Sequence, residues 1–555
     1  MKRMIAILLF LLLCVDGIDI FAFSSMSYQA FQTSISIDEK TRDDMPSGVQ
    51  DSSCINIQRS TKSYLIADPT GKDATLLKEK SRQAGLDLGL TVLANRVPTD
   101  SKLVAPKPTK HLLKHGLLHL QLPIDAEQNE FAVYHTEVFD EPATINVLQI
   151  DDELVTYRTT ETTGNIQLFY LCVRGAFGTK KTAHGTNAIV YKLWDTPERT
   201  LLPDFELQNQ MVLSEAKKLA KTDYPLLIFN DLKSYAYNEQ GDEAIGHLLD
   251  TMRKYNPDKL LQADLLTPAS RHGLNRVNEN ELWNETMRTK IVETLAQKQE
   301  YYRSNGIPWM IGNFQIHLAT NNRKATTTEE LEWFLSKAAA FEAGFGLDFS
   351  AETMHKHGLT DTILNTINIW ETLRLSDAFS EEQKEAFKDP YGNWHLEQAD
   401  DSTYLLYPQH ISRRYFCDFK NDTWQWNSPY TSPFALRIEV EGKGSISDLG
   451  FTTPNGYLYL PRTVKAGQYL FYCFNGEVYI TDMNYNKIEE VLAEETVPFL
   501  EEDASKTSSF LKEGTSEVSF VCKVKPEGKK QPEVSLRFLT RGEPETIILN
   551  NGDSR

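Results

Sequence analysis

Two carboxylates and two amides occur where short apolar runs of this sequence end. The run PLLIFNDLK contains Asn230 and Asp231, and the run KLLQADLLTPASRHG contains Gln262 and Asp264. Glycoside hydrolysis needs two carboxyl groups that flank one bond, which makes Asp231 and Asp264 the candidate catalytic pair. The two amides are candidate substrate ligands. An aspartate at a strand end more commonly caps a helix or accepts backbone amides, and this second interpretation remains open beside the first.

A stretch with helical periodicity separates the two apolar runs, so the local pattern predicts a strand, a helix and a second strand. Strands that are apolar throughout are covered by helices on both faces of their sheet. Side chains at the carboxyl ends of such strands point into the crevice in which α/β proteins bind their ligands. We therefore expect the four polar side chains to lie together in one crevice.

Basic and aromatic residues near predicted strand ends are candidates for contacts with a substrate. Arg271 and His272 follow the second run, where they could bind the carboxylate or sulfate of an acidic sugar; a loop of solvated charges accounts for them equally well. His317 lies near the end of the predicted strand IPWMIGNFQIHL. It could transfer a proton or bind a hydroxyl, although a lone histidine there is more commonly only hydrogen-bonded. Trp309, in the same strand, is the candidate sugar platform.

Other polar residues give weaker signals. Asp68, Asp348 and Glu352 are further candidate carboxylates. His355 and His357 lie near two of them, but a spacing of two residues does not place both imidazoles on one helical face, so no metal site is predicted. The sequence contains no GxSxG, P-loop, dinucleotide-binding or HExxH motif. This disfavours serine-hydrolase, nucleotide and zinc-protease chemistry, and no cofactor is expected.

The composition is that of an acidic globular protein with several domains. The chain has 555 residues, 41% of them hydrophobic and 10% aromatic, and this length exceeds that of one ordinary domain. Its formal net charge of −19 argues against nucleic acid or an anionic membrane as the main partner, because both require a basic face. The 23 tyrosines are enough to supply sugar-stacking surfaces, and carbohydrate is the partner that we expect.

The N-terminal segment predicts export. Two basic residues precede an apolar run, and small residues follow it, which is typical of a secretory signal peptide, here over 1–24. No later segment reaches the length of a transmembrane helix, so we expect no integral membrane segment after signal removal. The mature protein is expected in the periplasm or outside the cell, where it could associate with a surface. A polar leader without periodicity is predicted over 25–60.

The rest of the chain predicts an α/β barrel with two β-rich additions. Units of strand and helix over 61–405 favour a (β/α)8-type barrel of the TIM kind, although only six such strands can be counted. Short alternating strands over 116–193 predict a small antiparallel β module inserted into that barrel. Over 410–550 helical periodicity disappears, and alternating strands with Gly, Pro and Asn turns predict a C-terminal β-sandwich.

Several segments resemble a group of exported bacterial glycoside-hydrolase-like β/α-barrel proteins with an inserted β module. They are LLKEKSRQAGLDLGLTVLAN, LQIDDELVTYRT, CVRGAFGTKKTAHGTNA, LLIFNDL and ATTTEELEWFLSKAAAFEAGFGLDFS. The segment RGAFGT is the most specific of them. The resemblance covers about 76–375 and implies a barrel that acts on glycans, without fixing a substrate.

The chain departs from this group at both strand ends. In the group, the first strand ends in Asp-Gly after an aromatic residue, and the second ends in Glu followed by Ala. Here Asn230 and Gln262 fall at these positions. An amide neither transfers the proton nor acts as a nucleophile, so both changes would disable hydrolysis and leave a sugar pocket. A shift of one residue at the first site restores Asp231, and a shift of two at the second restores Asp264. The sequence leaves both registers open.

Three functions remain compatible with the sequence. The first is an exported glycoside hydrolase that cleaves a poly- or oligosaccharide with Asp231 and Asp264. The second is a catalytically inactive barrel that binds glycans through Asn230 and Gln262. The third is a surface protein whose C-terminal sandwich binds carbohydrate while the barrel is inert. Convergence of the two aspartates in one site would favour the first function.

Overall fold

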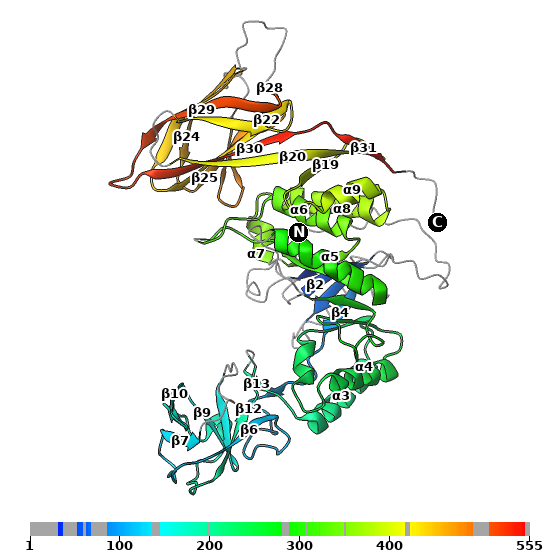
Figure 1. Ribbon diagram of the computed structural model, residues 1–555, viewed down its shortest axis with the longest axis vertical. Helices are drawn as coiled ribbons and strands as arrows, with labels where there is room; N and C mark the ends of the chain where they lie inside the picture. The colour runs from blue at the N-terminus through cyan, green and yellow to red at the C-terminus, as the bar shows by residue number, and fades with distance from the viewer. Residues whose placement is uncertain are drawn as a thin grey trace. The chain divides into compact units, whose positions relative to one another are not determined.

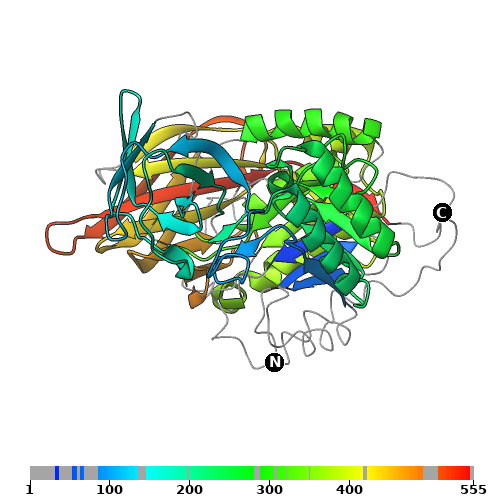
Figure 2. The same cartoon turned by 90° about the horizontal axis from the view of Figure 1, so that it is seen from below.

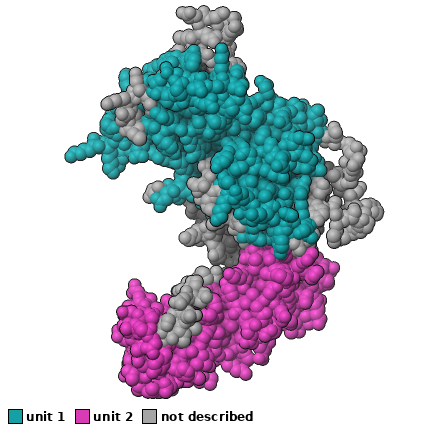
Figure 3. All heavy atoms as spheres, viewed as in Figure 1, with its two compact units in different colours: residues 1–89, 278–555 teal, residues 90–277 magenta. Residues whose placement is uncertain are grey.

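The computed structural model describes most of the chain and contains two compact units (Figures 1 and 3). The described residues are 32–36, 53–58, 63–67, 86–134, 145–196, 199–279, 288–305, 309–320, 322–348, 351–416, 422–454, 456–491 and 510–549. The first unit comprises 1–89 and 278–555, and the second comprises 90–277. The predicted signal peptide over 1–24 lies outside the described residues, as does Asp68. No helix of the described part has both the length and the apolar character needed to cross a membrane.

The second unit contains the parallel strands after which Asp231 and Asp264 occur. The elements are the last two residues of β4 (Leu86–Thr91), α3 (Phe205–Leu219), β14 (Leu226–Phe229), α4 (Asp242–Tyr255), β15 (Leu260–Ala263) and the first two residues of β16 (Arg276–Asn278). β14 pairs in parallel with β15, and β15 pairs in parallel with β16, while β4 neighbours β14 on its other side. α4 connects β14 to β15, and α3 precedes β14; the two helices lie beside each other, as labelled in Figure 1 and seen from below in Figure 2. The predicted succession of strand, helix and strand is confirmed.

The first unit contains further barrel-type strands and a group of helices. The strands are β1 (Gln32–Ser36), β2 (Ser53–Gln58), β3 (Ser63–Ala67), β17 (Trp309–Gln315) and β18 (Gly344–Asp348). β18 pairs in parallel with both β17 and β1, whereas β1, β2 and β3 follow one another antiparallel. The helices are α5 (Arg288–Asn305), α6 (Thr328–Ala340), α7 (Ala351–Lys356), α8 (Thr360–Leu375) and α9 (Glu381–Phe387). The mixed α/β class is confirmed.

β1 and β2 fall within 25–60, for which the sequence predicts a polar leader without regular structure. Thr33 and Ile35 of β1 lie opposite Ile57 and Ile55 of β2. β-Branched residues therefore alternate with other residues on each strand, which suits β structure. The alternation spans only a few residues in a polar stretch, so the sequence pattern did not separate these strands from a leader.

The second unit also contains an antiparallel module between β4 and β14. A two-residue pair closes its base, where β5 (Val97–Pro98) pairs with β13 (Thr200–Leu201). Its other strands are β6 (Lys114–His119), β7 (Phe131–Tyr134), β8 (Val147–Ile150), β9 (Glu153–Thr156), β10 (Thr159–Thr163), β11 (Ile166–Tyr170) and β12 (Ile189–Leu193). They form two small sheets, in the orders β6-β12-β8-β9 and β10-β11-β7. The chain thus enters and leaves the module side by side.

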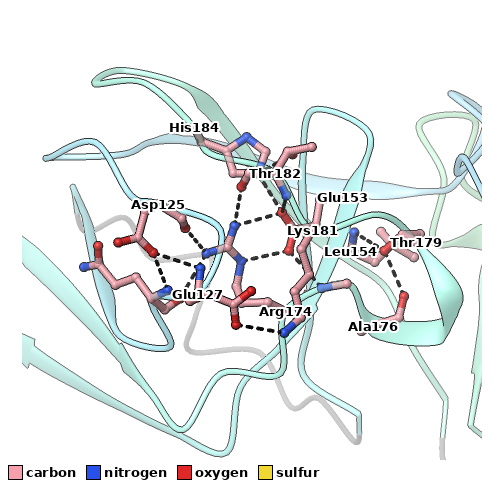
Figure 4. A network of polar contacts seen from close by, with 12 residues as sticks. Asp125, Glu127, Glu153, Leu154, Arg174, Ala176, Thr179, Lys181, Thr182 and His184 are labelled. Carbon is pink, nitrogen blue, oxygen red and sulfur yellow. Dashed lines mark hydrogen bonds and ion pairs between the residues drawn. The ribbon is translucent and has the colours of Figure 1, made fainter.

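The core of this module encloses a charged cluster that includes the first residue of the RGAFGT segment (Figure 4). The fully buried carboxylate of Glu153 accepts hydrogen bonds from two nitrogens of Arg174, at 2.8 Å and 2.9 Å. His184 Nε2 lies 2.9 Å from the same carboxylate, which also accepts the backbone N–H groups of Gly175 and Thr182. Burial alone would raise the pKa of Glu153, but these hydrogen bonds lower it to about 2. The carboxylate is therefore ionised in the folded module.

Further contacts fix the backbone around this cluster. A third nitrogen of Arg174 donates to the carbonyl oxygens of Asp125 and Gln128, at 2.6 Å and 3.0 Å. Gly175 has a φ of 62°, and a Cβ at this position would lie 2.8 Å from the carbonyl oxygen of Thr179. Only glycine fits this conformation without strain. The first two residues of RGAFGT therefore have structural roles: Arg174 forms a buried ion pair, and Gly175 allows the tight turn that positions it.

The C-terminal part of the first unit is rich in β structure. Its strands are β19 (Asn393–Gln398), β20 (Thr403–Phe416), β21 (Asp422–Ser428), β22 (Ser432–Gly442), β23 (Ser445–Thr453), β24 (Gly456–Lys465), β25 (Gln468–Tyr472), β26 (Val478–Asp482), β27 (Lys487–Val491), β28 (Phe510–Leu511), β29 (Gly514–Lys525), β30 (Pro532–Arg541) and β31 (Glu545–Ile548). One sheet runs β19-β20-β30-β22-β25-β26-β27, with β28 and β31 at its side, and the other runs β21-β29-β23-β24. Apolar side chains from both sheets form one core, so the sheets pack as a sandwich.

A partly buried histidine joins α6 to the first strand of the larger sheet. His395 Nδ1 lies 2.9 Å from a carboxylate oxygen of Glu332 on α6, and its Nε2 lies 3.0 Å from Glu397. Glu332 also accepts the backbone N–H of Leu396 and the indole N–H of Trp370. Burial would lower the pKa of His395, but the charge of Glu332 and hydrogen bonds with both carboxylates raise it to about 9. The protonated imidazole therefore bridges two carboxylates at neutral pH.

Raising the pH from 6.5 to 9 is expected to destabilise this junction. A histidine whose pKa rises from 6.5 to about 9 on folding contributes stability that is complete below pH 6.5 and is lost as the pH rises through 9. The loss in the free energy of unfolding should approach roughly 3 kcal/mol. Urea unfolding across this pH range measures it, and His395→Gln should flatten the curve. An equally steep loss in the variant would contradict the assignment to His395.

Candidate active site

The chain segments that follow β4 and β14 are joined by hydrogen bonds in the second unit. The backbone N–H of Ala94 donates to Tyr235 Oη at 2.7 Å, and Asn95 Nδ2 donates to Ser234 Oγ at 2.8 Å. Tyr235 and Ser234 belong to η4 (Leu232–Ala236), a short 3-10 helix that follows β14. The two neighbouring strand ends are therefore held together by buried polar contacts.

Asp231 lies at the turn between β14 and η4, where its carboxylate is accessible. The residue has a left-handed backbone conformation with a φ of 57°, and its side chain is 48% exposed. The carboxylate forms an ion pair with the guanidinium of Arg96, whose side chain is only 8% exposed. Arg96 also donates to Asn95 Oδ1 and to Ser234 Oγ, at 2.6 Å and 3.0 Å. The site thus contains an accessible carboxylate held by a well-anchored cation.

Asp264 directly follows β15 and contacts the turn that carries Asp231. Its Oδ2 accepts the backbone N–H of Asp231 at 2.6 Å, and its Oδ1 accepts that of Leu232 at 2.9 Å. Burial raises the pKa of Asp264; the two backbone hydrogen bonds oppose this rise, and the charge of Asp231 adds to it. Two carboxylates in different environments therefore meet at neighbouring strand ends. The oxygens of Asp264 at the same time stabilise the turn after β14.

The two candidate amides differ in their placement. Asn230 directly follows β14 and is exposed, one residue before Asp231. Gln262 lies within β15, where it is buried and accepts a hydrogen bond from Arg276 Nε on the neighbouring strand. The structure thus brings Asn230, Asp231 and Asp264 to one place, whereas Gln262 is engaged inside the sheet.

Replacement of Gln262 by leucine is expected to lower the free energy of unfolding by about 1.5–3 kcal/mol. The reason is that Arg276 is buried and would lose an acceptor for its guanidinium. Gln262→Glu keeps oxygen acceptors at this position and should be less destabilising than leucine. Urea unfolding at neutral pH compares the three proteins. A leucine variant as stable as the wild type would show that this hydrogen bond does not contribute.

The other two candidates in the second unit, Arg271 and His272, lie in the turn between β15 and β16, and both are exposed. The backbone of this turn is fixed on either side of them. Ser270 is buried and donates to the carbonyl oxygen of Thr267, and Arg253 Nε donates to that of Gly273 at 2.9 Å. The two basic side chains are therefore presented to solvent from a well-held turn, which suits a substrate contact and solvated charges alike.

Trp309 and His317 belong to the first unit, on β17 and just after it. Trp309 is buried and stacks on Tyr302 of α5, with ring centroids 5.6 Å apart. This packing corrects the expectation of a sugar platform, because the ring lies in the interior. His317 Nδ1 lies 2.5 Å from Thr326 Oγ1, and burial, together with the charge of Arg323, lowers its pKa to about 4. The imidazole is therefore neutral and hydrogen-bonded at neutral pH.

The weaker candidates add no second cluster among the described residues. Asp348 ends β18 and Glu352 lies in α7, but their side chains are outside the described part of the structure. His357 Nε2 lies 3.0 Å from the carbonyl oxygen of Thr326. In the described ranges, no three side chains of the types His, Cys, Asp and Glu are grouped to hold a metal ion.

Arg96 and three aromatic residues of the second unit were not singled out from the sequence. Trp194 and Tyr237 stack with ring centroids 4.8 Å apart and planes 20° from parallel, and His115 meets Trp194 edge-on. Tyr237 directly follows η4 and is 36% exposed. Arg96 directly follows the predicted strand GLDLGLTVLAN. This position at a strand end is the one sequence signal that could have marked it as a candidate. The aromatic residues come from three separate segments, so only the fold brings them together.

Comparison with known proteins finds only distant structural similarity. No protein-family model and no curated protein matches the chain. A solved GH27 β-L-arabinopyranosidase from Geobacillus stearothermophilus matches over 83% of this chain and 79% of its own, at 10% identity and a TM-score of 0.28. The glycoside hydrolase domain of PelA from Pseudomonas aeruginosa matches over 53% of this chain and 96% of its own, at 10% identity and a TM-score of 0.28.

An α-galactosidase from Thermus thermophilus matches over 60% of this chain and 52% of its own, at 12% identity and a TM-score of 0.28. All three of these neighbours are glycoside hydrolases. Similarity at these identities and TM-scores assigns neither a family nor an activity to the chain, so its function is argued from its own residues.

Proposed function

We propose that this protein is an exported glycoside hydrolase whose carboxylate pair is Asp231 and Asp264. The observation that carries the proposal is their contact, in which Asp264 Oδ2 accepts the backbone N–H of Asp231 at 2.6 Å. This contact holds the Asp264 carboxylate against the backbone of the turn that carries Asp231, and two carboxyl groups on adjoining strand ends can flank one glycosidic bond. Asp231, accessible and paired with Arg96, acts as the ionised carboxylate. Asp264, whose pKa is raised by burial, acts as the proton donor.

The surrounding side chains suit a sugar substrate. Trp194 and Tyr237 are stacked, and aromatic faces of this kind pack against the C–H faces of pyranosides. Asn230 is exposed beside Asp231, where its amide can bind hydroxyl groups. Arg271, in the exposed turn after β15, provides a cation for an acidic substituent, and His272 beside it provides a further hydrogen-bonding group.

The proposal extends to the architecture and to export. We infer a (β/α)8-like barrel from the repeated units of strand and helix along the chain, and the parallel order β14-β15-β16 supports it. The antiparallel pairing of β2 with β1 and β3 departs from the regular form. Export, inferred from the predicted signal peptide over 1–24, would expose the site to polysaccharides of the periplasm or the exterior.

A glycan-binding function without hydrolysis is the second candidate, and one observation favours it. Both oxygens of Asp264 accept backbone N–H groups, which stabilises the ionised form and gives this carboxylate a structural task. In that case Asn230, Asp231 and Arg96 bind sugar hydroxyls, and no group donates the proton that cleavage requires.

Incubation with a panel of neutral and acidic oligosaccharides distinguishes the two functions. Purified full-length protein is mixed with each compound, and NMR follows the appearance of new reducing ends. Turnover supports the hydrolase. Binding in titration calorimetry without turnover supports the second candidate. A folded protein that neither binds nor cleaves any member of the panel rejects both.

A further inference from the structure

Two tyrosines lie side by side on the outer face of the smaller sandwich sheet. Tyr457 and Tyr459 are two residues apart on β24, so both point away from the core that contains Leu458 and Leu460. Their rings are 12° from parallel, with centroids 6.3 Å apart. Tyr457 is 40% exposed. The sheet therefore presents a pair of parallel aromatic rings to solvent.

A glycine and a carboxylate hold these rings in place. Gly450 of β23 lies opposite Tyr459 of β24. A Cβ at position 450 would come within 2.6 Å of Tyr457 Oη. The ring of Tyr457 thus packs on backbone that bears no side chain, a known way in which aromatic residues cover a glycine in a sheet. The hydroxyl of Tyr459 donates to Asp448 Oδ1 at 3.1 Å, and Asp448 Oδ2 lies 3.0 Å from Lys523 Nζ. Both rings are therefore fixed before any ligand arrives.

The polar groups next to the rings are balanced in charge. Asp448 and Lys523 neutralise each other as an ion pair. Thr452, which is exposed, lies opposite Tyr457 on one side and Ser519 on the other. Hydroxyls and an internally paired charge favour a ligand that offers hydrogen bonds without net charge. Rings that are already immobilised lose little conformational entropy on binding.

We propose that this face binds a strand of a neutral polysaccharide, at a site separate from the carboxylate pair of the second unit. Parallel rings on a flat sheet can stack on the C–H faces of neighbouring pyranose units. Thr452 lies opposite Tyr457 and Ser519 lies one strand further on, and both hydroxyl groups are available to bond to sugar hydroxyls. The sandwich thereby holds the protein on a polymer whether or not the second unit cleaves it.

Affinity electrophoresis of the full-length protein in native gels tests this proposal. Soluble galactomannan, xyloglucan and arabinogalactan serve as neutral probes, and alginate serves as the acidic one. At least one neutral probe is expected to retard the wild type. Tyr457→Ala and Tyr459→Ala should each weaken this retardation by about tenfold or more. Thr452→Arg should have a similar effect, because it covers the ring of Tyr457 without removing any packing.

Tyr415→Ala is the matched control, since Tyr415 is 64% exposed on β20 of the other sheet. Trp194→Ala reports binding in the second unit, so a loss of retardation in this variant alone overturns the proposal. No retardation by any neutral probe, retardation by alginate alone, or wild-type behaviour of Tyr457→Ala and Thr452→Arg overturns it as well. Melting temperatures establish that each variant is folded. Because the measurement requires no hydrolysis, its outcome is independent of the proposed catalytic function.

Discussion

Replacement of Asp231 by asparagine is expected to lower kcat by about 10²- to 10⁴-fold on any glycoside that the protein cleaves. Asparagine keeps the size of the side chain and can still accept a hydrogen bond from Arg96, which holds the carboxylate in the wild type. It is neutral, however, and cannot act as a nucleophile or base. The loss should appear in kcat more than in KM, because the charge is required in the transition state. Steady-state and single-turnover kinetics measure both constants.

Glu239→Gln is the matched control for this experiment. Glu239 is exposed in the same unit, shortly after η4, so its replacement removes an equal charge without touching the site. Asp264→Asn separates the two tasks of Asp264. Lost activity at an unchanged melting temperature identifies a proton donor, whereas lost stability identifies an acceptor of backbone amides. Full activity of Asp231→Asn would exclude Asp231 as a catalytic group.

Removal of the Glu153 carboxylate is expected to lower the stability of the inserted module by about 3–5 kcal/mol. Glu153→Ala leaves Arg174 and His184 buried without the carboxylate that both of them contact. An uncompensated charge in the interior costs far more than the loss of an exposed pair. Urea unfolding gives the change in free energy, and limited proteolysis should show faster cleavage between β5 and β13.

Glu127→Ala is the control, because Glu127 forms an exposed ion pair with Lys181 at 3.3 Å (Figure 4). Its loss should cost less than about 1 kcal/mol. The dependence of stability on acidic pH provides an independent check on the role of Glu153. Folding lowers the pKa of Glu153 from 4.5 to about 2, so its contribution is complete above pH 4.5 and is lost as the pH falls through 2. Wild-type stability of Glu153→Ala, or an unchanged acid limb, would contradict a stabilising role for the cluster.

The strand ends that carry the candidate pair could be predicted from local pattern alone. Each is a continuous apolar run that ends in polar residues, and such runs in an α/β protein are strands buried on both faces. The structure has β14 and β15 within these runs, paired in parallel. A prediction of this kind needs no knowledge of any other part of the chain, which is why it succeeds.

The register at these ends could not be predicted. The choice between Asn230 and Asp231 depends on a left-handed turn at Asp231, which the backbone of that turn stabilises by donating to Asp264. Gln262 is within β15, whereas Asp264 lies just beyond it. A shift of one residue reverses the direction of a side chain in a strand. The apolar residues of a run do not determine the residue at which its strand ends.

Arg96, Trp194 and Tyr237 could not be predicted because they come from three separate segments. Arg96 is anchored through Ser234, which is distant in sequence. Trp194 and Tyr237 stack across two different elements. None of these contacts leaves a local pattern in the sequence. The expectation at Trp309 was wrong for the same reason, because the sequence around a tryptophan does not show whether its ring is buried or exposed.

The two-residue pairing of β5 with β13 has an evolutionary consequence. Leu201 lies opposite Val97 in this pair, so the polypeptide between them forms a cassette with adjoining ends. Recombination at this stem would replace the entire cassette in one step, while Arg96 and Asp231 outside it keep their positions. A lineage could in this way acquire a new module beside the proposed active site without changing the strands that precede the acidic residues.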